Sequence, residues 1–209
     1  MNRTELINKL IHKNKYSSYL EIGLDSGSNY LEIQCAERES VDSFFPEDHN
    51  GWDMSMKNGL PQHIAKLLTY RMTSDDFFDK CDRKYDIIFI DGLHTEEQVG
   101  KDIVNSLRHL NEGGIIVVHD CLPQSEAAQR VPRIQSEWNG DVWKAIVELT
   151  KEGLVIEVVD CDYGVGLIKQ CVFNKYPDKC DVEWSDFEQD KGKYINIISV
   201  NDFELKYLV

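Results

Sequence analysis

The sequence lacks a hydrophobic run long enough to cross a membrane. Its longest apolar runs, residues 85–90 and 115–118, have the length of strands, whereas a membrane-spanning helix needs about 20 consecutive apolar residues. Residues 1–5 are polar and contain none of the apolar stretch of a signal peptide. We therefore expect a cytoplasmic protein with no membrane partner.

Paired cysteine motifs and positive charge are also scarce. The six cysteines show no C-x-x-C spacing, which argues against a zinc finger or a disulfide scaffold and indicates reduced thiols. The 209 residues carry 23 Lys and Arg against 37 Asp and Glu, a net charge of −14. Because the phosphate backbone attracts basic surfaces, so acidic a chain argues against a nucleic-acid partner. No Pro-, Ser- or Gly-rich linker divides the chain, and its length suits one ordinary domain.

What the chain does have is an alternation of strand and helix patterns. Residues 85–90 form a β-branched apolar run that ends at an Asp-Gly pair, as a strand buried on both faces does. The pattern predicts strands at 19–22, 70–72, 85–90, 115–118, 155–160 and 165–169, and a further strand that ends at residue 42. It predicts helices at 4–13, 29–35, 63–68, 95–110 and 142–149, and a further helix that begins at residue 74.

This alternation is typical of an α/β fold with a doubly wound, mostly parallel, Rossmann-like sheet. The hairpin formed by the last two predicted strands would place one antiparallel strand at an edge. We expect a domain over residues 1–171 and a C-terminal extension over 172–209 that packs on this domain or on a neighbouring protomer. Residues 43–63 contain loop signals and could fold over a ligand.

The first segment that carries chemistry is the turn after the strand at 19–22. It contains Glu21, Gly23, Asp25 and Gly27, and its glycines let a ligand approach the backbone closely. Its spacing differs from G-x-G-x-x-G because Asp25 stands in place of the second glycine. Its two carboxylates would repel phosphate and attract a cationic or amino-bearing ligand. The alternative is an ordinary strand-to-helix turn.

Two further acids lie where neighbouring strands are predicted to end. Asp42 ends the second strand, a position from which an acid can accept hydrogen bonds from ribose hydroxyls, with Glu39 as the alternative. Asp75 either caps the helix that begins near Ser74 or reaches the base of a ligand.

The strongest cluster follows the fourth and fifth strands. Asp91 and His94 come three residues apart after the fourth strand, and His119, Asp120 and Cys121 follow the fifth. Because parallel strands end at one edge of a sheet, these side chains should share a crevice. Asp91 and Asp120 could bind a divalent metal, and a neutral histidine could act as a base. A lone Asp or His at a strand end is more often a cap, but two such pairs on neighbouring strands are less easily dismissed.

These segments resemble the class I S-adenosylmethionine (SAM)-dependent methyltransferases, and more narrowly the family that includes the macrocin-type sugar O-methyltransferases. The resemblance extends over about residues 17–170 and is most specific in an Asp-Gly-x-His motif followed by Gly-Gly-x-x-x-x-His-Asp. The residues that carry it are 19–23, 85–95, 113–120, 138–146 and 162–166.

The resemblance implies a role for each site residue. Glu21, Gly23 and Gly27 would surround the methionine part of SAM, with Asp25 adding negative charge beside it. Asp42 would hold the ribose hydroxyls, and Ser74 and Asp75 would lie by the adenine. Asp91 would lie beside the methionine end of the cofactor and would face the substrate.

The same resemblance implies the catalytic groups. Asp91 and Asp120 match the acids that hold Mg²⁺ or another divalent metal in metal-dependent relatives. Cys121 stands where those relatives have an amide or a second acid, so His119 would substitute as the third ligand. His94 has the spacing of the catalytic base, with Asp91 and His119 as the other catalytic candidates.

We therefore expect a methyltransferase that acts on a hydroxyl of a small molecule, such as a sugar or a glycan precursor, and that could form a homo-oligomer. The acceptor could instead be a nitrogen or a phosphate-type oxygen, or the chain could be a non-catalytic binding protein that keeps the fold. A dinucleotide-dependent dehydrogenase is disfavoured because the glycine spacing is wrong and Asp25 crowds the pyrophosphate site.

Overall fold

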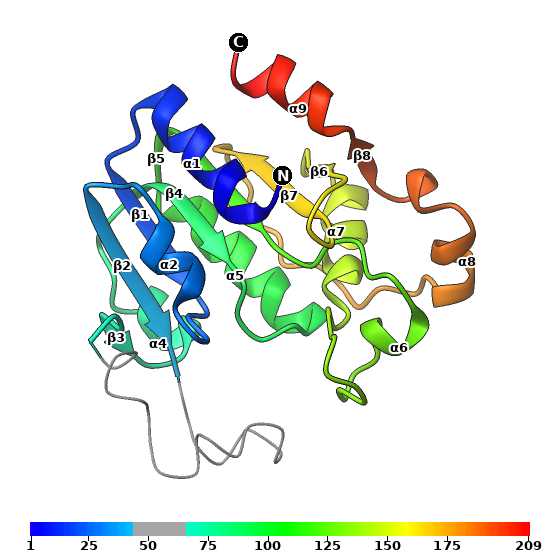
Figure 1. Cartoon of the computed structure of the whole chain (residues 1–209). Helices are drawn as coiled ribbons and strands as arrows, with labels where there is room; N and C mark the ends of the chain where they lie inside the picture. The colour runs from blue at the N-terminus through cyan, green and yellow to red at the C-terminus, as the bar shows by residue number, and fades with distance from the viewer. Residues whose placement is uncertain (44–65) are drawn as a thin grey trace.

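The computed structural model describes residues 1–43 and 66–209, and within them one sheet runs through the molecule (Figure 1). Its strand order is β3-β2-β1-β4-β5-β7-β6-β8. The strands are β1 (Ser18–Ile22), β2 (Glu37–Asp42), β3 (Tyr70–Arg71), β4 (Tyr85–Ile90), β5 (Leu110–Val118), β6 (Glu157–Val159), β7 (Val165–Lys169) and β8 (Asn196–Ile198). The doubly wound α/β fold predicted from the sequence is confirmed.

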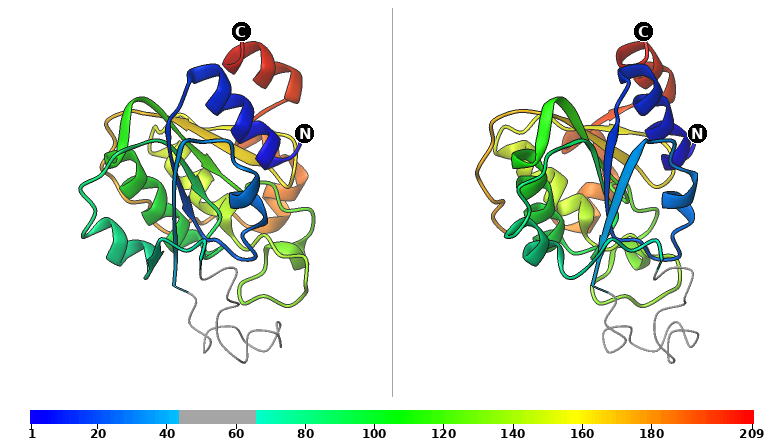
Figure 2. Two further views of the ribbon diagram at one scale, coloured as in Figure 1. Left: turned by 60° about the vertical axis from the view of Figure 1, so that its left-hand side comes forward. Right: turned by 90° about the vertical axis from the view of Figure 1, so that its left-hand side faces the viewer.

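Helices cover both faces of this sheet, so the molecule has three layers (Figure 2). One face carries α1 (Arg3–Asn14), α2 (Ser28–Glu32) and α9 (Val200–Tyr207); the other carries α4 (Ser74–Phe78), α5 (Glu96–Arg108), α7 (Val142–Lys151) and α8 (Trp184–Gln189). Two short elements, α6 (Glu126–Gln129) and the 3₁₀ turn η2 (Lys191–Lys193), lie in connections.

Alternation along the strands divides the core between the two faces. On β1, Tyr19 packs with α1 and α2, whereas Leu20 and Ile22 pack with the helices of the opposite face. Both kinds of side chain are buried, because a parallel sheet covered on both faces excludes water from either side.

The antiparallel strand is β7, which forms the predicted hairpin with β6 and pairs with β5 on its other side. We expected this strand at an edge of the sheet, but two more strands continue the sheet beyond it. The outermost is β8, which pairs parallel to β6. Three residues of the C-terminal segment thus extend the sheet, a pairing that depends on tertiary contacts rather than on local sequence.

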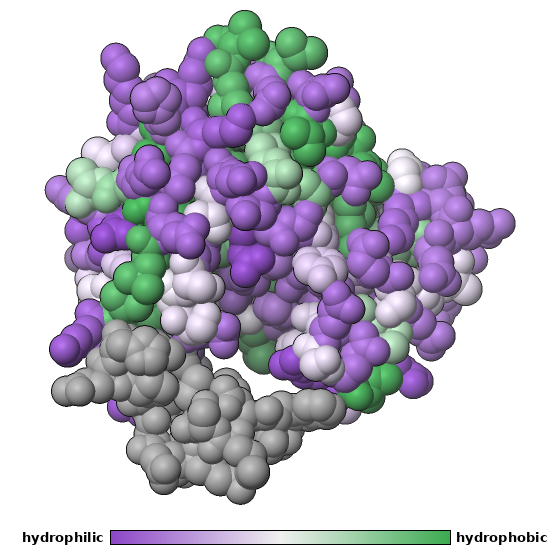
Figure 3. Space-filling view, in the orientation of Figure 1, coloured by the Kyte–Doolittle hydropathy of each residue, from purple (hydrophilic) through white to green (hydrophobic). Residues whose placement is uncertain are grey.

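The C-terminal segment contacts both faces of the domain. Phe187 of α8 stacks on Trp143 of α7, with ring centroids 4.1 Å apart, while Phe203 of α9 is buried in the core beside α1. Leu205 and Val209 are exposed, and Figure 3 shows hydrophobic side chains over this top part of the molecule, above a mostly hydrophilic face. The boundary predicted at residue 171 stays a prediction.

Most predicted elements are present, with shifts of a few residues at their ends. The helix expected at 29–35 is the shorter α2, and the loop expected at 43–63 lies almost entirely outside the described residues. The helix expected at 63–68 lies partly outside them, and its residues 66–68 form a turn. Among the described residues, no helix is long and apolar enough to cross a membrane.

Candidate functional site

The carboxyl ends of β1, β4 and β5 lie side by side and bring three chemistry-bearing turns together. The backbone ladder continues one residue past each strand: Asp91 N donates to Ile22 O at 2.8 Å, and His119 N donates to Ile90 O at 3.0 Å. The turns after these strands therefore meet at one edge, as the sequence predicted.

Gly23 allows the β1 turn to contact the β4 turn. Its φ is +87°, and a Cβ built on it would lie 2.1 Å from the backbone oxygen of Asp91. Gly27 also has a positive φ, as does Asp25, which is exposed. Asp42 at the end of β2 accepts a hydrogen bond from Leu24 N at 2.7 Å, so this predicted ribose ligand also fixes the shape of the turn.

Glu21 is buried under this turn. Its Oε2 accepts hydrogen bonds from the Tyr19 hydroxyl and from Asn29 Nδ2, the latter at 2.9 Å. Burial raises the pKa of Glu21 to about 8, although both hydrogen bonds oppose the shift. The residue predicted to lie near the methionine end of SAM is therefore largely protonated at neutral pH.

Two carboxylates and two imidazoles form a ring at the ends of β4 and β5. His94 lies between the acids, with Nε2 3.2 Å from Asp91 Oδ1 and Nδ1 3.2 Å from Asp120 Oδ2. His119 Nδ1 lies 3.3 Å from Oδ1 of Asp91 and 3.3 Å from Oδ1 of Asp120. The structure thus brings together the catalytic and metal-ligating candidates that the sequence placed after these two strands.

The contacts in this ring change the pKa values of Asp91 and of both histidines. Burial alone would lower the pKa of His94, but its contacts with Asp91 and Asp120 raise it more, and the pKa of His119 rises for the same reason. Burial would raise the pKa of Asp91, yet the two imidazoles hold it well below its usual range. The two imidazoles and Asp91 thus favour one another's charged forms.

The sequence did not assign Arg3 or Asp162 to this site. Arg3, in the first turn of α1, lies with Nε 3.7 Å from Asp91 Oδ2, and its Nη1 donates to Asp162 Oδ2 at 3.2 Å. Asp162 also lies 3.6 Å from His119 Nε2. The turn between β6 and β7 opens at this edge of the sheet, so Asp162 could have been found from topology, but the position of Arg3 depends on how α1 packs.

The segment before α7 adds Trp138 and Asn139. Trp143 is buried in the core, whereas Trp138 is half-buried and stacks on His94 with ring centroids 5.2 Å apart. Asn139 Nδ2 donates to Asp120 Oδ1 at 2.6 Å. Only a glycine at position 140 allows this segment to lie so close to the His94 backbone, because a Cβ on Gly140 would lie 1.8 Å from His94 O.

Ser74 and Asp75, the predicted adenine residues, belong to a separate network. Gln98 Nε2 lies 3.1 Å from Ser74 Oγ, from Asp75 Oδ1 and from Asp102 Oδ1. Asp102 is buried, which raises its pKa to about 7. The sequence offered no signal for Gln98 or Asp102 beyond their place on α5.

Asp91, His94 and Asp120 could hold a cation, because each offers a ligand atom and these atoms lie within 4.8 Å of one another. Cys121, which stands in the position of an amide or acid in the motif, is turned into the core: it is buried, and its Sγ lies 3.5 Å from Val118 O. Burial raises the pKa of this thiol, so it stays protonated and is a poor ligand.

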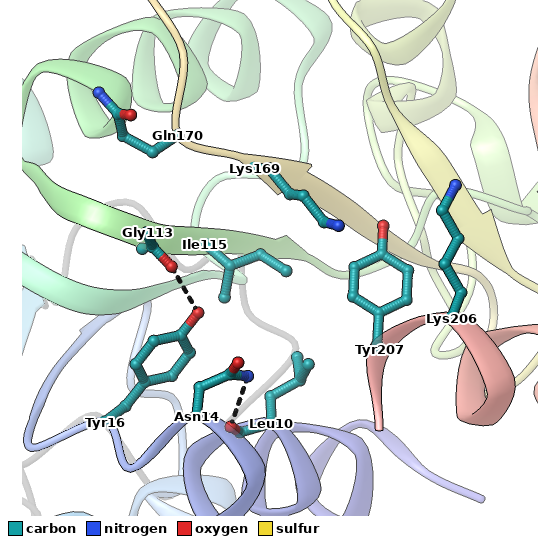
Figure 4. Close-up of a pocket in the computed structure, with 10 residues that line it drawn as sticks. Leu10, Asn14, Tyr16, Gly113, Ile115, Lys169, Gln170, Lys206 and Tyr207 are labelled. Carbon is teal, nitrogen blue, oxygen red and sulfur yellow. Dashed lines mark hydrogen bonds between the residues drawn. The ribbon is translucent and has the colours of Figure 1, made fainter. Parts of the chain in front are cut away.

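A cavity lies at the opposite end of the sheet from the candidate site, and its lining residues are of different types. This cavity of about 350 Å³ is lined by α1, the beginning of β5, the end of β7 and α9 (Figure 4). Tyr16 donates to Gly113 O at 2.8 Å on one side, and Lys169 lies over the Tyr207 ring on the other. It lies at the amino ends of the parallel strands, away from the ring of carboxylates and imidazoles.

Residues 20–121 match the family model of a methyltransferase domain. The match covers the carboxyl ends of β1, β2, β4 and β5, so all the strand-end residues of the candidate site except Asp162 fall within it. No curated protein matches the sequence.

Solved structures show the same fold at low sequence identity. An SAH-bound methyltransferase from Podospora anserina has 16% identity and a TM-score of 0.57 over 81% of this chain and 78% of its own. An O-methyltransferase from Streptomyces achromogenes involved in tomaymycin synthesis, solved with SAM, has 14% identity and a TM-score of 0.52 over 82% and 80%. An O-methyltransferase from Bacillus cereus in complex with SAH has 14% sequence identity and a TM-score of 0.51, and the comparison covers 80% of this chain and 79% of that structure's chain. The architecture is that of the class I methyltransferases.

Proposed function

We propose that the protein is a SAM-dependent O-methyltransferase that acts on a hydroxyl group of a small molecule, such as a sugar or a glycan precursor. The observation that carries the proposal is the ring of Asp91, His94, Asp120 and His119 directly beside the glycine turn. The solved structures with SAM and with SAH bound support the choice of cofactor.

In this proposal the turn of Gly23, Asp25 and Gly27 borders the methionine end of the cofactor, with Glu21 beneath it. Asp42 lies by the ribose, and Ser74 and Asp75 lie by the adenine. The acidic edge suits a sulfonium, whose positive charge is lost as the methyl group moves to the acceptor. The enzyme's task is then to align the acceptor oxygen with the methyl carbon and to remove the hydroxyl proton.

His94 is the proposed base, with Asp91 and His119 as its catalytic neighbours. His94 accepts a proton only in its neutral form, and the cationic cofactor beside Asp91 would favour that form by opposing the positive charge of the imidazolium. Trp138 covers one face of this imidazole and limits its contact with water.

The donor set also fits a divalent cation. Asp91, Asp120 and His119 are the proposed ligands, and His94 offers a further nitrogen. Next to Asp120, Asn139 Oδ1 is buried and has no hydrogen-bond partner in the part of the chain that the structure describes. When bound, such a cation would supply Lewis-acid stabilisation of a deprotonated hydroxyl.

The test is a calorimetric titration of the protein with SAH, run with Mg²⁺ and again with a chelator. Saturable binding at one site supports the proposal and justifies a screen of hydroxylated acceptors; a folded sample that does not bind SAH in either condition sinks it. Methyl transfer to a nitrogen or to a phosphate-type oxygen in that screen would favour the alternative acceptors. SAH binding without any transfer would favour a binding protein.

We further propose a cytoplasmic enzyme that acts without nucleic-acid or membrane partners. A homo-oligomer, for which the exposed Leu205 and Val209 offer contact surface, would appear in sedimentation measurements.

A further inference from the structure

Asn139 lies against the carboxylate ring with one unsatisfied atom. The residue is 2% exposed, and its Nδ2 donates to Asp120 Oδ1 at 2.6 Å. Its Oδ1 is buried and has no hydrogen-bond partner among the described residues. A buried acceptor without a donor is unfavourable, so an unpartnered oxygen beside a charged cluster calls for a physical reason.

We infer that Asn139 is an oxygen ligand of a divalent cation bound by Asp91 and Asp120. This inference deepens the proposed function and rests on it. The amide is supplied by the segment before α7, whereas Cys121, which directly follows Asp120, has its thiol in the core and cannot supply an oxygen.

The carboxamide is suited to this role because its two ends have opposite preferences. Without a cation, the N–H end faces Asp120, since a carboxylate accepts hydrogen bonds. A half turn about the Cβ–Cγ bond brings Oδ1 to face the same carboxylate, an arrangement that is favourable only with a cation between the two oxygens. Carboxylate and amide oxygens with an imidazole form a donor set that suits Mn²⁺ or Mg²⁺.

The backbone fixes Asn139 in this position. Asn139 N and Gly140 N both donate to Ala128 O, at 2.9 and 3.1 Å, and Asp141 N donates to His94 O at 3.2 Å. Gly140 itself lies against the backbone of His94. The segment therefore holds the side chain of Asn139 in a fixed position beside Asp120, as a metal ligand requires.

The test uses Mn²⁺ as the probe and the full-length protein. Asparagine labelled with ¹³C at the side-chain carbonyl is incorporated, and pulsed electron–nuclear double resonance (ENDOR) is recorded on bound Mn²⁺. A ligating Asn139 gives a strong ¹³C coupling that is lost in Asn139→Ala. The dipolar coupling falls with the inverse cube of distance, so a spectrum with only a weak coupling would show that Asn139 merely orients Asp120 and would overturn the inference.

Affinity provides the second readout. Mn²⁺ titrations should show binding about tenfold weaker in Asn139→Ala, and unchanged binding in Cys121→Ala and in Ser136→Ala, an exposed position of the same segment. SAH titrations on the same samples check that each variant is folded. A wild-type protein that binds SAH but not Mn²⁺ overturns this inference and leaves the methyltransferase proposal intact, whereas failure to bind SAH overturns that proposal itself.

Discussion

The two ends of the central sheet are built differently, although the same strands reach both. The carboxyl end gathers non-glycine residues with left-handed backbone: Asp25, Asp120, Asp162 and Tyr163 all have positive φ. At the amino end, the one non-glycine residue with positive φ among those described is Lys15, which caps α1. Left-handed caps are routine, whereas strained non-glycine residues gathered at one edge are typical of a functional site.

A cavity lined by described residues lies at the amino end, whereas the paired carboxylates and imidazoles lie at the carboxyl end. The cavity beside Tyr16 and Lys169 is about 350 Å³ in volume, but its polar groups are hydroxyls, amides and lysines with no carboxylate–imidazole pair among its lining residues. In an open α/β sheet, the end at which the parallel strands finish is the better guide to the functional site.

The largest expected difference between the two ends is in catalysis. His94→Ala should reduce methyl transfer by about 10²–10⁴-fold, the usual contribution of a general base, and should leave SAH affinity within about threefold. Lys169→Ala, in the cavity at the other end, should leave the rate unchanged. The measurement is the rate of SAH formation with an acceptor from the screen. Full activity in His94→Ala would remove this histidine from the mechanism.

The next difference concerns two glycines with similar backbone angles. A Cβ at Gly23 (φ +87°) meets the backbone of Asp91, whereas a Cβ at Gly113 (φ +76°) meets nothing within 4 Å. Gly113→Ala therefore adds only left-handed strain, about 1 kcal/mol, and Gly23→Ala adds a backbone clash for a total of roughly 3–5 kcal/mol. Urea unfolding of both variants measures the difference. Equal losses would mean that the β1 and β4 turns can separate easily.

Two buried glutamates should respond to pH with opposite sign. Glu21 has a pKa raised to about 8 by burial, so folding favours its protonated form and its contribution to stability is lost as pH rises from about 4.5 to 8. Relative to wild type, Glu21→Gln should therefore become more stable across this window, by on the order of 3 kcal/mol. Urea unfolding at several pH values measures the trend.

Glu157 is the control for this trend. Burial opposes ionisation, but Lys206 and Tyr207 lower its pKa overall. Its contribution to stability is present above its unfolded pKa, near 4.5, and is lost as pH falls through the lower folded value. Glu157→Gln should thus cost stability above pH 4.5 and cost less in acid. The same slope for both variants would show that the two carboxyl groups do not differ as the structure indicates.

The sequence predicted the parts of the fold that local pattern determines. Tyr85–Ile90 is a mostly apolar segment with three isoleucines before Asp-Gly, so the sequence predicted β4 and its end. The Asn196–Ile198 strand has three residues and exists because β6 offers an unpaired edge. No local pattern encodes that pairing, and for the same reason the prediction could not place β7 two strands inside the sheet.

In the candidate site too, some residues could be predicted from local sequence pattern, and others depend on tertiary contacts. Asp91, His94, His119 and Asp120 could be grouped in advance because their strands are neighbours and end at one edge. Arg3 and Asn139 reach the same place from segments whose positions depend on helix packing and on the Gly140 contact. Whether the predicted residues perform their proposed roles stays a prediction for the experiments above.

The smallest expected effect tests whether a change at the amino end of the sheet leaves cofactor binding and methyl transfer at the carboxyl end unaltered. Tyr16→Phe removes the hydrogen bond to Gly113 O and should cost about 1 kcal/mol of stability, with SAH affinity and methyl transfer unchanged. Urea unfolding and calorimetric titration on the same sample measure both. The hydroxyl lies at the amino end of the strands whose other ends carry Asp91 and Asp120, so a loss of SAH affinity beyond about threefold would mean that the sheet couples its two ends. The cavity would then have to be considered as part of the functional unit.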